Sequence, residues 1–335
     1  MLSRIFLTFS AIAFLSCGKA SKNEVVVYVT VDQVFSEPIL KDFEKETGIT
    51  VKPVYDTEET KSTGVMNRLI AEKDNPQCDV FWSGDPIRNN VLKSKGITDS
   101  FTSQSSQQIP DYFKDKDKHW IGFSARARVL IYNSKLISKD SLPQSLKDLI
   151  QERFKGKFAI ANPLFGTTTF HIAALFSIWG EDQTKDWLNA IKTNNVVVAT
   201  SNGDVKKRTI NGEIIFGLTD TDDAFEAKKE SSDVDFIFLD QTVDGTGTLI
   251  MPNALGIIKG SPNTQNGKKL MDYLLSKETE ARLAISCAQM PLIKGTKLPE
   301  GIPSLDAIIP MKIDYEETSD MLQKMQPWLK QWLEK

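Results

Sequence analysis

The chain alternates between short apolar runs and segments with helical spacing, and this alternation limits the folds that it can adopt. Residues 25–30 read VVVYVT, a continuous apolar run typical of a strand that is buried on both faces. Apolar residues then recur three to four positions apart through 35–43, and Gly48 marks the end of that helix. Further apolar runs follow at 49–55 and 79–82, with a second helical segment between them. This strand–helix–strand–helix–strand order predicts an α/β fold with a parallel sheet.

A second set of α/β elements follows a long extended segment, 119–133 (HWIGFSARARVLIYN). Another extended segment, 248–258, would return the chain to the first set. Because no flexible linker separates the two sets, we predict two lobes joined by strands of the sheet. Within the second set, the expected helix is 168–179 and the expected strands are 158–160, 196–198, 214–216 and 236–238. The expected bounds are 24–124 and 245–302 for lobe 1, 125–244 for lobe 2, and 303–335 for C-terminal helices that dock on a lobe.

The N-terminus carries the pattern of an export signal. Arg4 precedes an apolar segment, 5–15, which is too short to span a membrane because a spanning helix needs about 20 apolar residues. One serine and then Cys17 follow that segment. We therefore expect a lipoprotein-type signal peptide at 1–17, lipidation of Cys17, and a tether at 18–23. The alternative is a plain secretory signal that is cleaved nearby. The expected location is the periplasm or the cell surface, with a lipid anchor as the contact with the membrane.

The charges of the chain exclude several partners. The 41 basic and 44 acidic residues give the 335-residue chain a net charge of −3, without the basic excess that binds nucleic acid or an anionic membrane. We expect a monomer.

Apart from Cys17, the chain has Cys78 and Cys287, which in an oxidising compartment either form a disulfide or remain as two buried thiols. The sequence leaves these two alternatives open.

Polar residues of a few kinds follow the predicted strands. In open α/β sheets, ligands bind beyond the carboxyl ends of the strands, so the residues directly after each apolar run are the candidates for a binding site. They carry hydroxyl, amide and carboxylate groups, and basic residues are absent from these positions. The candidate ligand-binding residues are Asp32, Gln33, Ser83, Asp85, Asn162, Thr167, Thr168, Ser201, Asn202, Asp220, Asp222 and Asp223.

Catalytic motifs are missing from the sequence. The two histidines, His119 and His171, have no partner at zinc-ligand spacing, and neither a glycine-rich phosphate loop nor a nucleophile elbow is present. We therefore expect no enzyme activity and no cofactor. A hydrolase with a metal held by carboxylates is the remaining enzymatic alternative. For Asp85, and for Asp220 or Asp222, the competing interpretation is that they cap the helices that follow them.

Several segments together resemble the ferric-iron-binding branch of the periplasmic solute-binding proteins of ABC importers, extracellular solute-binding family 1. The resemblance runs, in order, through VVVYVTVDQVFSEPILKDFEKETGI, VMNRLIAEKDNPQCDVFWSGDP, ARVLIYN, FAIANPLFGTTTF, INGEIIFGLTDTDDA, GTLIMPNALGIIKGSP and MDYLLSKETEARLA. It implies the two-lobed type II binding-protein fold, in which lobes hinged by crossing strands close on a solute. It also implies delivery of that solute, iron(III) in this branch, to an ABC permease and its ATPase.

At the positions of the iron ligands, the sequence differs from that family. The iron-binding members carry a histidine where this chain has Asp32, a glutamate where it has Gly84, and two adjacent tyrosines where it has Asp222 and Asp223. Carboxylates keep negative charge in the cleft, so the expected ligand is a cation or has a cationic end. If it is a metal, Asp32, Asp222 and Asp223 would hold it. The alternative is an amine-bearing solute such as an aminophosphonate, whose anionic group would bind at the helix start 166–169.

Overall fold

The computed structural model describes residues 23–56 and 62–334. The predicted signal peptide, the predicted lipidation site Cys17 and all but the last residue of the predicted tether lie outside the described residues. In the part of the chain that the structure describes, no helix has both the length and the apolar character needed to cross a membrane.

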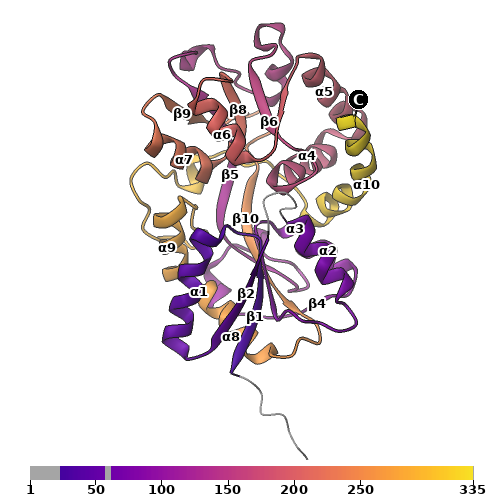
Figure 1. The fold of residues 1–335 in the computed structure, drawn as a ribbon, viewed down its shortest axis with the longest axis vertical. Coiled ribbons are helices and arrows are strands. Elements are labelled where there is room, and N and C mark those ends of the chain that lie inside the picture. Colours follow the sequence, from indigo (N-terminus) through magenta and orange to yellow (C-terminus); the bar gives the residue numbers. More distant parts are fainter. Residues whose placement is uncertain (1–22, 57–61, 335) are drawn as a thin grey trace, which may run out of the picture.

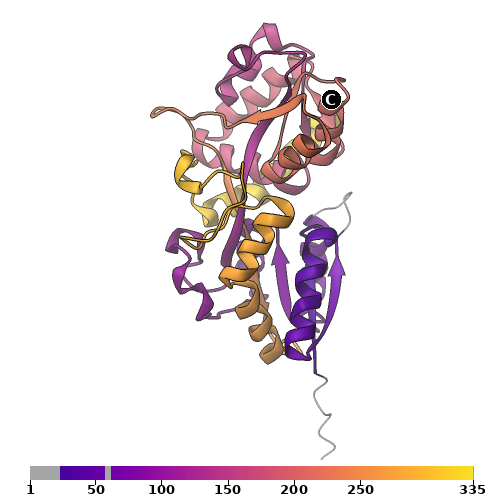
Figure 2. The same ribbon diagram turned by 90° about the vertical axis from the view of Figure 1, so that its left-hand side faces the viewer.

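The molecule has the two-lobed mixed α/β fold that the resemblance implies (Figure 1). The strands are β1 (Glu24–Val29), β2 (Thr50–Tyr55), β3 (Val80–Ser83), β4 (Thr98–Asp99), β5 (Ile121–Asn133), β6 (Phe158–Ala161), β7 (Val197–Ala199), β8 (Phe216–Asp220), β9 (Val234–Ile237) and β10 (Ile250–Ile258). Within the described residues they form one ten-stranded sheet with the order β2-β1-β3-β10-β5-β8-β6-β7, in which β4 also pairs with β10 and β9 with β5. Figures 1 and 2 show one lobe above the other.

Helices cover the sheet in both lobes. They are α1 (Gln33–Thr47), α2 (Thr63–Ala71), α3 (Pro86–Ser94), α4 (Gly166–Trp179), α5 (Glu181–Thr193), α6 (Asn202–Ile210), α7 (Thr221–Glu230), α8 (Thr264–Leu274), α9 (Lys277–Cys287) and α10 (Tyr315–Glu334). Short 3₁₀ helices occupy Ser105–Gln108, Asp111–Phe113, Lys139–Ser141, Leu146–Ile150, Glu152–Phe154 and Leu305–Ala307. β1 pairs in parallel with β2 and β3, and β6 pairs in parallel with β7 and β8, which confirms the predicted parallel sheets.

β5 connects the two lobes. Its first half, from Ile121 to Ala127, pairs antiparallel with β10, and its second half, from Arg128 to Tyr132, pairs antiparallel with β8. β10 pairs in turn with β3 of the first lobe. The backbone of β5 therefore changes its main partner between Ala127 and Arg128, and the hinge between the lobes consists of crossing strands, as the sequence predicts.

The strand that leads to the aspartates of GLTDTDDA differs from the prediction. The apolar run predicts a strand at 214–216 followed by a loop, whereas β8 extends from Phe216 to Asp220 and α7 begins at the next residue. Gly217 allows this, because a Cβ atom there would lie only 2.5 Å from Cγ1 of Val205 on α6. The polar end of β8 is buried, so the apolar residues alone do not mark the bounds of this strand.

α10 contacts both lobes, whereas the sequence predicts C-terminal helices docked on one lobe. Within the described residues, α10 is the one α-helix beyond residue 303. It packs against α3 of the first lobe and α4 of the second (Figure 1). At its start, the centroid of the Tyr315 ring lies 5.3 Å from that of Trp120 and 6.4 Å from that of Phe170. The C-terminal segment therefore adds a connection between the lobes besides the crossing strands.

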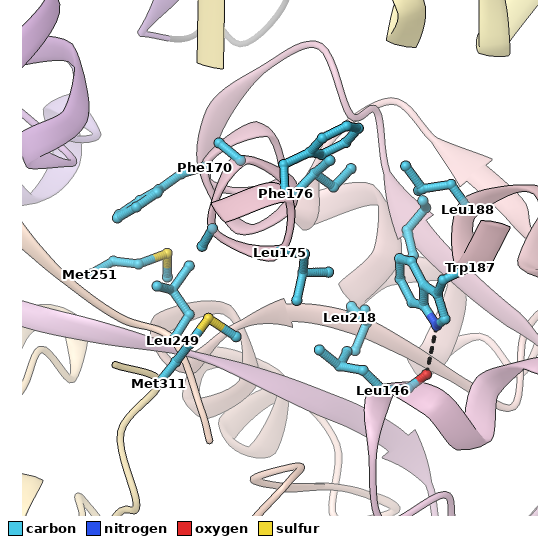
Figure 3. Packing of buried hydrophobic residues seen from close by; sticks show 14 of the residues in the cluster. Leu146, Phe170, Leu175, Phe176, Trp187, Leu188, Leu218, Leu249, Met251 and Met311 are labelled. Carbon is cyan, nitrogen blue, oxygen red and sulfur yellow. Dashed lines mark hydrogen bonds between the residues drawn. The ribbon is translucent and has the colours of Figure 1, made fainter. Parts of the chain in front are cut away.

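Buried apolar side chains fix the position of α4 (Figure 3). Phe170 and Leu175 of α4 belong to one buried cluster with Leu218 of β8 and Met251 of β10. Every α4 residue from 167 to 176 is buried. Close packing on all sides leaves such a helix little freedom to shift. The core therefore determines where the first turn of α4 lies.

Cys78 and Cys287 are separate buried thiols, which decides between the two alternatives that the sequence leaves open. Cys78 precedes β3, and Cys287 ends α9. Burial raises the pKa of both thiols, and that of Cys287 to about 12. Their thiolate forms are disfavoured, so both side chains act as small apolar residues of the core.

One buried carboxylate connects α9 to the crossing strand. Glu280 accepts hydrogen bonds from the backbone N–H groups of Ser124 (2.8 Å), Leu292 (3.0 Å) and Ile293 (2.8 Å). Ser124 has a φ of 46°, and the register between β5 and β10 shifts beside Asn253, which binds the carbonyl oxygen of Ser124. Glu280 thus satisfies the N–H of Ser124, which the irregular pairing of these strands leaves open, and two N–H groups of the segment after α9.

We expect Glu280→Ala to lower the free energy of unfolding by about 2–5 kcal/mol, because it leaves buried N–H donors without an acceptor. Glu278→Ala is the matched control, since Glu278 is exposed in the first turn of the same helix and its loss should cost less than about 1 kcal/mol. Urea denaturation followed by tryptophan fluorescence measures both variants. Equal losses would show that Glu280 does not stabilise this region.

Candidate functional site

A cavity of about 640 Å³ lies between the lobes, at the carboxyl ends of strands from both. From the first lobe, Thr30 and Asp32 after β1 and Gly84 after β3 line it. Arg126 of β5 lines it at the crossing, and the first turns of α4, α6 and α7 line it from the second lobe. The polar strand ends and helix starts of both lobes therefore meet around one space.

Most of the predicted site residues lie together in this cavity. Gln33 and Ser83 are the exceptions. The Gln33 side chain is exposed and donates to Glu37 (2.9 Å), and the buried Ser83 hydroxyl accepts from the backbone N–H of Asp85 (3.3 Å). The predicted residues that line the cavity are Asp32, Asp85, Asn162, Thr167, Thr168, Ser201, Asn202, Asp220, Asp222 and Asp223.

Asp85 lines the cavity, but an arginine balances its charge. At the N-cap of α3, its carboxylate accepts a hydrogen bond from the backbone N–H of Arg88 (3.1 Å). The Arg88 guanidinium also forms an ion pair with this carboxylate, and both side chains are 1% exposed. A buried, paired carboxylate has little remaining capacity to attract a charged ligand. The helix-cap interpretation is therefore correct for Asp85.

Two arginines that the sequence prediction misses bring positive charge to the site. Arg126 and Arg128 are two positions apart on β5, so their side chains leave the same face of the strand. Nη1 of Arg128 lies 2.6 Å from Oδ1 of Asp220 at the end of β8, and both side chains are almost fully buried. The other carboxylate oxygen of Asp220 accepts from Oγ1 of Thr167 (2.7 Å) and Nδ2 of Asn202 (3.1 Å). Both oxygens of Asp220 are therefore occupied.

A sequence pattern marks these arginines. The motif ARAR at 125–128 places two cations at alternate positions of an otherwise apolar strand, and a charge inside a buried strand needs an opposite charge nearby. The rule that ligands bind beyond strand ends points away from positions within strands, so it does not select them. Of the two, Arg126 lines the cavity, and the polar lining residues that the sequence prediction also misses include Asp204, Lys206, Lys207, Arg208 and Glu226 of α6 and α7.

Arg126 contacts both lobes. Its Nη2 donates to the backbone oxygen of Gly84 (2.6 Å), and its Nη1 lies 3.7 Å from a carboxylate oxygen of Asp220 and 3.7 Å from one of Asp222. Burial alone would lower the pKa of Arg126, but Asp222, Asp220 and Asp32 outweigh it and raise this pKa above its ordinary value. Arg126 is therefore a permanent positive charge among acidic residues.

Three aspartates at the start of α7 form the acidic cluster of the site. Carboxylate oxygens of Asp220, Asp222 and Asp223 lie within 4.8 Å of one another. Asp222 and Asp223 are in the first turn of α7, where the helix dipole favours negative charge. Asp220 occupies the N-cap position, but its side chain makes no capping hydrogen bond. Asp32, which the sequence groups with Asp222 and Asp223, is not a member of this cluster.

The protonation of Asp222 is sensitive to its surroundings. Burial raises the pKa of Asp222 to about 6. Arg126 acts in the opposite direction, whereas Asp220 and Asp32 add to the increase. An ammonium group beside Asp222 would favour the ionised form, so a cationic ligand and a proton compete for this carboxylate.

The first turn of α4 faces the same cavity. Phe165 occupies the N-cap, and the helix start has no side-chain cap. The first N–H groups of a helix have no partner within the helix, and those of Gly166, Thr167 and Thr168 belong to residues that line the cavity. Such N–H groups, together with the helix dipole, form a binding site for anions. The cavity thus combines an acidic cluster with a helix start that suits an anion.

The two hinged lobes and the polar cavity between them define a periplasmic solute-binding protein of an ABC importer. Comparison with family models gives the same result, because residues 39–307 match the bacterial extracellular solute-binding proteins. The chain belongs to this family. Its members bind solutes without transforming them, so the protein is not an enzyme. Membership implies an ABC permease as partner and a small solute as ligand.

Similar proteins cover most of the chain. The "Putative 2-aminoethylphosphonate-binding periplasmic protein" of Salmonella typhimurium is 27% identical over 341 residues, which cover 99% of this chain and 93% of that protein. Iron uptake protein A1 of Synechocystis is 24% identical over 310 residues, covering 86% of this chain and 84% of that protein. The crystal structure of iron-bound HitA from Pseudomonas aeruginosa is 22% identical with a TM-score of 0.83, and the match covers 91% of this chain and 99% of that chain. The structural likeness confirms the fold.

The raised pKa of Asp222 predicts a pH dependence of stability. Because this pKa is about 6 in the folded protein and ordinarily 3.8, the folded state binds the proton more tightly than the unfolded state. Asp222 therefore stabilises the fold most at low pH, and the contribution falls as the pH rises through the interval between these values. We expect the ligand-free wild type to lose about 2 kcal/mol relative to Asp222→Asn between about pH 4 and pH 7. Urea denaturation at several pH values measures this difference; a constant difference would contradict the raised pKa.

Proposed function

We propose that this protein binds a small solute with an amine and a phosphonate or similar anionic group, of the 2-aminoethylphosphonate type, and delivers it to an ABC permease. The observation that carries the proposal is the presence, in one cavity, of an acidic cluster at the start of α7 and an uncapped helix start at α4. The first suits a cationic group and the second suits an anion. A single solute that carries both charges matches both parts of the cavity.

The composition of the cavity disfavours Fe(III), the other solute that the sequence leaves open. Both oxygens of Asp220 are engaged by buried donors, including Arg128. The other two carboxylates of the cluster are those of Asp222 and Asp223. Among the described residues that line the cavity, none is tyrosine, histidine or cysteine. The histidine and tyrosine ligands that the iron-binding members use are therefore missing from the described lining of this cavity.

The amine would lie near Asp222 and Asp223, with Asp32 facing it from the first lobe. Asp32 and Asp222 line the same cavity and interact electrostatically, because Asp32 raises the pKa of Asp222. An ammonium group has three N–H donors, so it can bind carboxylates on both sides of the cavity. Contacts of one ligand with both lobes are lost when the lobes separate, so they favour the closed form.

The phosphonate would bind at the first turn of α4. Its oxygens would accept hydrogen bonds from the backbone N–H groups of Gly166, Thr167 and Thr168. Ser201 lies nearby as the N-cap of α6, where its Oγ accepts from the backbone N–H of Asp204 (3.1 Å). The hydroxyl proton of Ser201 remains available as a further donor to the anion.

We also propose that a lipid on Cys17 holds the protein at the membrane as a monomer. The apolar segment 5–15 ends just before this cysteine, and the polar residues 18–23 follow it. An anchor at this end would keep both lobes close to the permease while the cleft opens and closes.

Isothermal titration calorimetry with a panel of solutes tests the proposed ligand. 2-Aminoethylphosphonate should bind one molecule per protein. Ethylphosphonate lacks the amine and ethanolamine lacks the phosphonate, so each should bind at least about tenfold more weakly. Ferric citrate is the probe for iron, with citrate alone as its control, and elemental analysis of the treated protein should find no stoichiometric iron. Bound iron, or equal affinity for ethylphosphonate and 2-aminoethylphosphonate, would overturn the proposal.

Asp222→Asn and Asp223→Asn should each weaken the binding of 2-aminoethylphosphonate by more than about tenfold, because removing one member of a desolvated charge pair costs about 2–5 kcal/mol. Asp204→Asn is the control, since Asp204 lines the same cavity but pairs with Arg208. The affinity of this variant for 2-aminoethylphosphonate should stay within about threefold of that of the wild type. Calorimetry measures affinity, and thermal melts without ligand measure stability. Variants at 222 and 223 that melt earlier but bind normally would assign these residues to stability alone.

A further inference from the structure

A fixed cation lies beside the acidic cluster of the site. Nη1 of Arg126 is 3.7 Å from Oδ2 of Asp220 and 3.7 Å from Oδ2 of Asp222. These distances exceed those of a hydrogen bond, so the guanidinium offsets the charge of the cluster without closing on either carboxylate. The buried Nε of Arg126 has no hydrogen-bond partner among the described residues. The guanidinium is therefore held in place by one strong hydrogen bond and by the field of the aspartates.

Gly84 provides both that hydrogen bond and the space for the guanidinium. Its backbone oxygen accepts from Nη2 of Arg126 at 2.6 Å. A Cβ atom on residue 84 would lie 3.0 Å from the same Nη2, closer than an ordinary van der Waals contact. Any side chain at this position would press on the guanidinium. The backbone oxygen of Gly84 and its lack of a side chain therefore both contribute to the position of the guanidinium.

The positive charge of Arg126 acts on any cation that enters the cluster. Its guanidinium is always charged, and it interacts electrostatically with Asp222, Asp220 and Asp32. A second cation in the cluster would lie within a few ångströms of the guanidinium, in a partly buried site where charges interact strongly. The repulsion by Arg126 is two or three times larger for a divalent or trivalent metal ion than for a singly charged ammonium group, and it offsets an attraction to the aspartates that grows in the same proportion.

We propose that Arg126 is a specificity-determining residue: its guanidinium excludes metal ions from the cluster of Asp220, Asp222 and Asp223 and leaves Asp222 and Asp223 to the singly charged amine of a solute. For the identity of that solute, this inference rests on the proposed function. The exclusion of metal ions does not depend on that identity and can be measured without it.

Titration with Tb³⁺, a hard trivalent ion, tests the exclusion. The wild type should bind Tb³⁺ weakly, and Arg126→Gln should bind it at least about tenfold more tightly in calorimetry. Arg126→Lys keeps the charge and should behave like the wild type. Lys207→Gln is the matched control, because Lys207 lines the same cavity and is exposed, so its loss removes the same charge at a solvent-screened position.

A double variant locates the effect. Adding Asp222→Asn to Arg126→Gln should reverse the gain in Tb³⁺ affinity if the ion binds at the cluster. Thermal melts and circular dichroism establish that each variant is folded. Arg126→Met, which removes the charge and keeps a long side chain, replaces Arg126→Gln if the latter does not fold.

The results separate this inference from the proposed function. A folded Arg126→Gln protein without a gain in Tb³⁺ affinity, or an equal gain in Lys207→Gln, would overturn the role of Arg126, even if the wild type binds 2-aminoethylphosphonate. Failure of the wild type to bind 2-aminoethylphosphonate, together with a gain of Tb³⁺ binding in Arg126→Gln alone, would remove the proposed ligand and support metal exclusion. Tight Tb³⁺ binding by the wild type would contradict both.

Discussion

The binding site depends on the buried ion pair between Arg128 and Asp220. Arg128 belongs to the crossing strand β5 and Asp220 ends β8, and Asp220 also accepts hydrogen bonds from Thr167 of α4 and Asn202 of α6. Four elements therefore meet at one carboxylate. Because both charges are almost fully buried, removing either partner would leave the other uncompensated, at a cost of about 3–5 kcal/mol. The helix starts that line the cavity are thus positioned by electrostatics as well as by packing.

The pairing of charges changes how the acidic residues of the cleft are understood. Asp85 is paired with Arg88 and Asp220 with Arg128, so these two carboxylates are less available as ligands for a charged solute. The protonation state of Asp222 depends on its surroundings, because burial opposes its ionisation and Arg126 favours it. In such a site, Arg126 already supplies part of the positive charge that balances the aspartates. A small amine can share the remaining carboxylates, whereas a metal ion would need most of them.

The sequence predicts the fold well because its signals are local: a continuous run such as VVVYVT indicates a buried strand wherever it occurs. The lining of the cavity is also predictable, because the carboxyl ends of parallel strands converge by geometry, which brings Asp32 near Asp222. The partners of the aspartates, in contrast, are not predictable from local patterns. Arg126 precedes Asp220 by more than ninety residues, and the two meet only because β5 pairs with β8. Long-range strand pairing leaves no local signal, so the charge balance of the site emerges only from the structure.

The position of α10 has a consequence for how the lobes move. Its Tyr315 ring packs near Trp120, just before β5, and its Trp328 ring packs on Phe176 of α4, so the helix has apolar contacts in both lobes. Rotation of the lobes about β5 cannot preserve all of these contacts, and apolar surface must slide or become exposed to water. Opening the cleft therefore also changes the packing of α10 against the two lobes. The packing of the 20-residue C-terminal helix therefore contributes to the free-energy difference between the open and closed forms, and the solute shifts the same equilibrium.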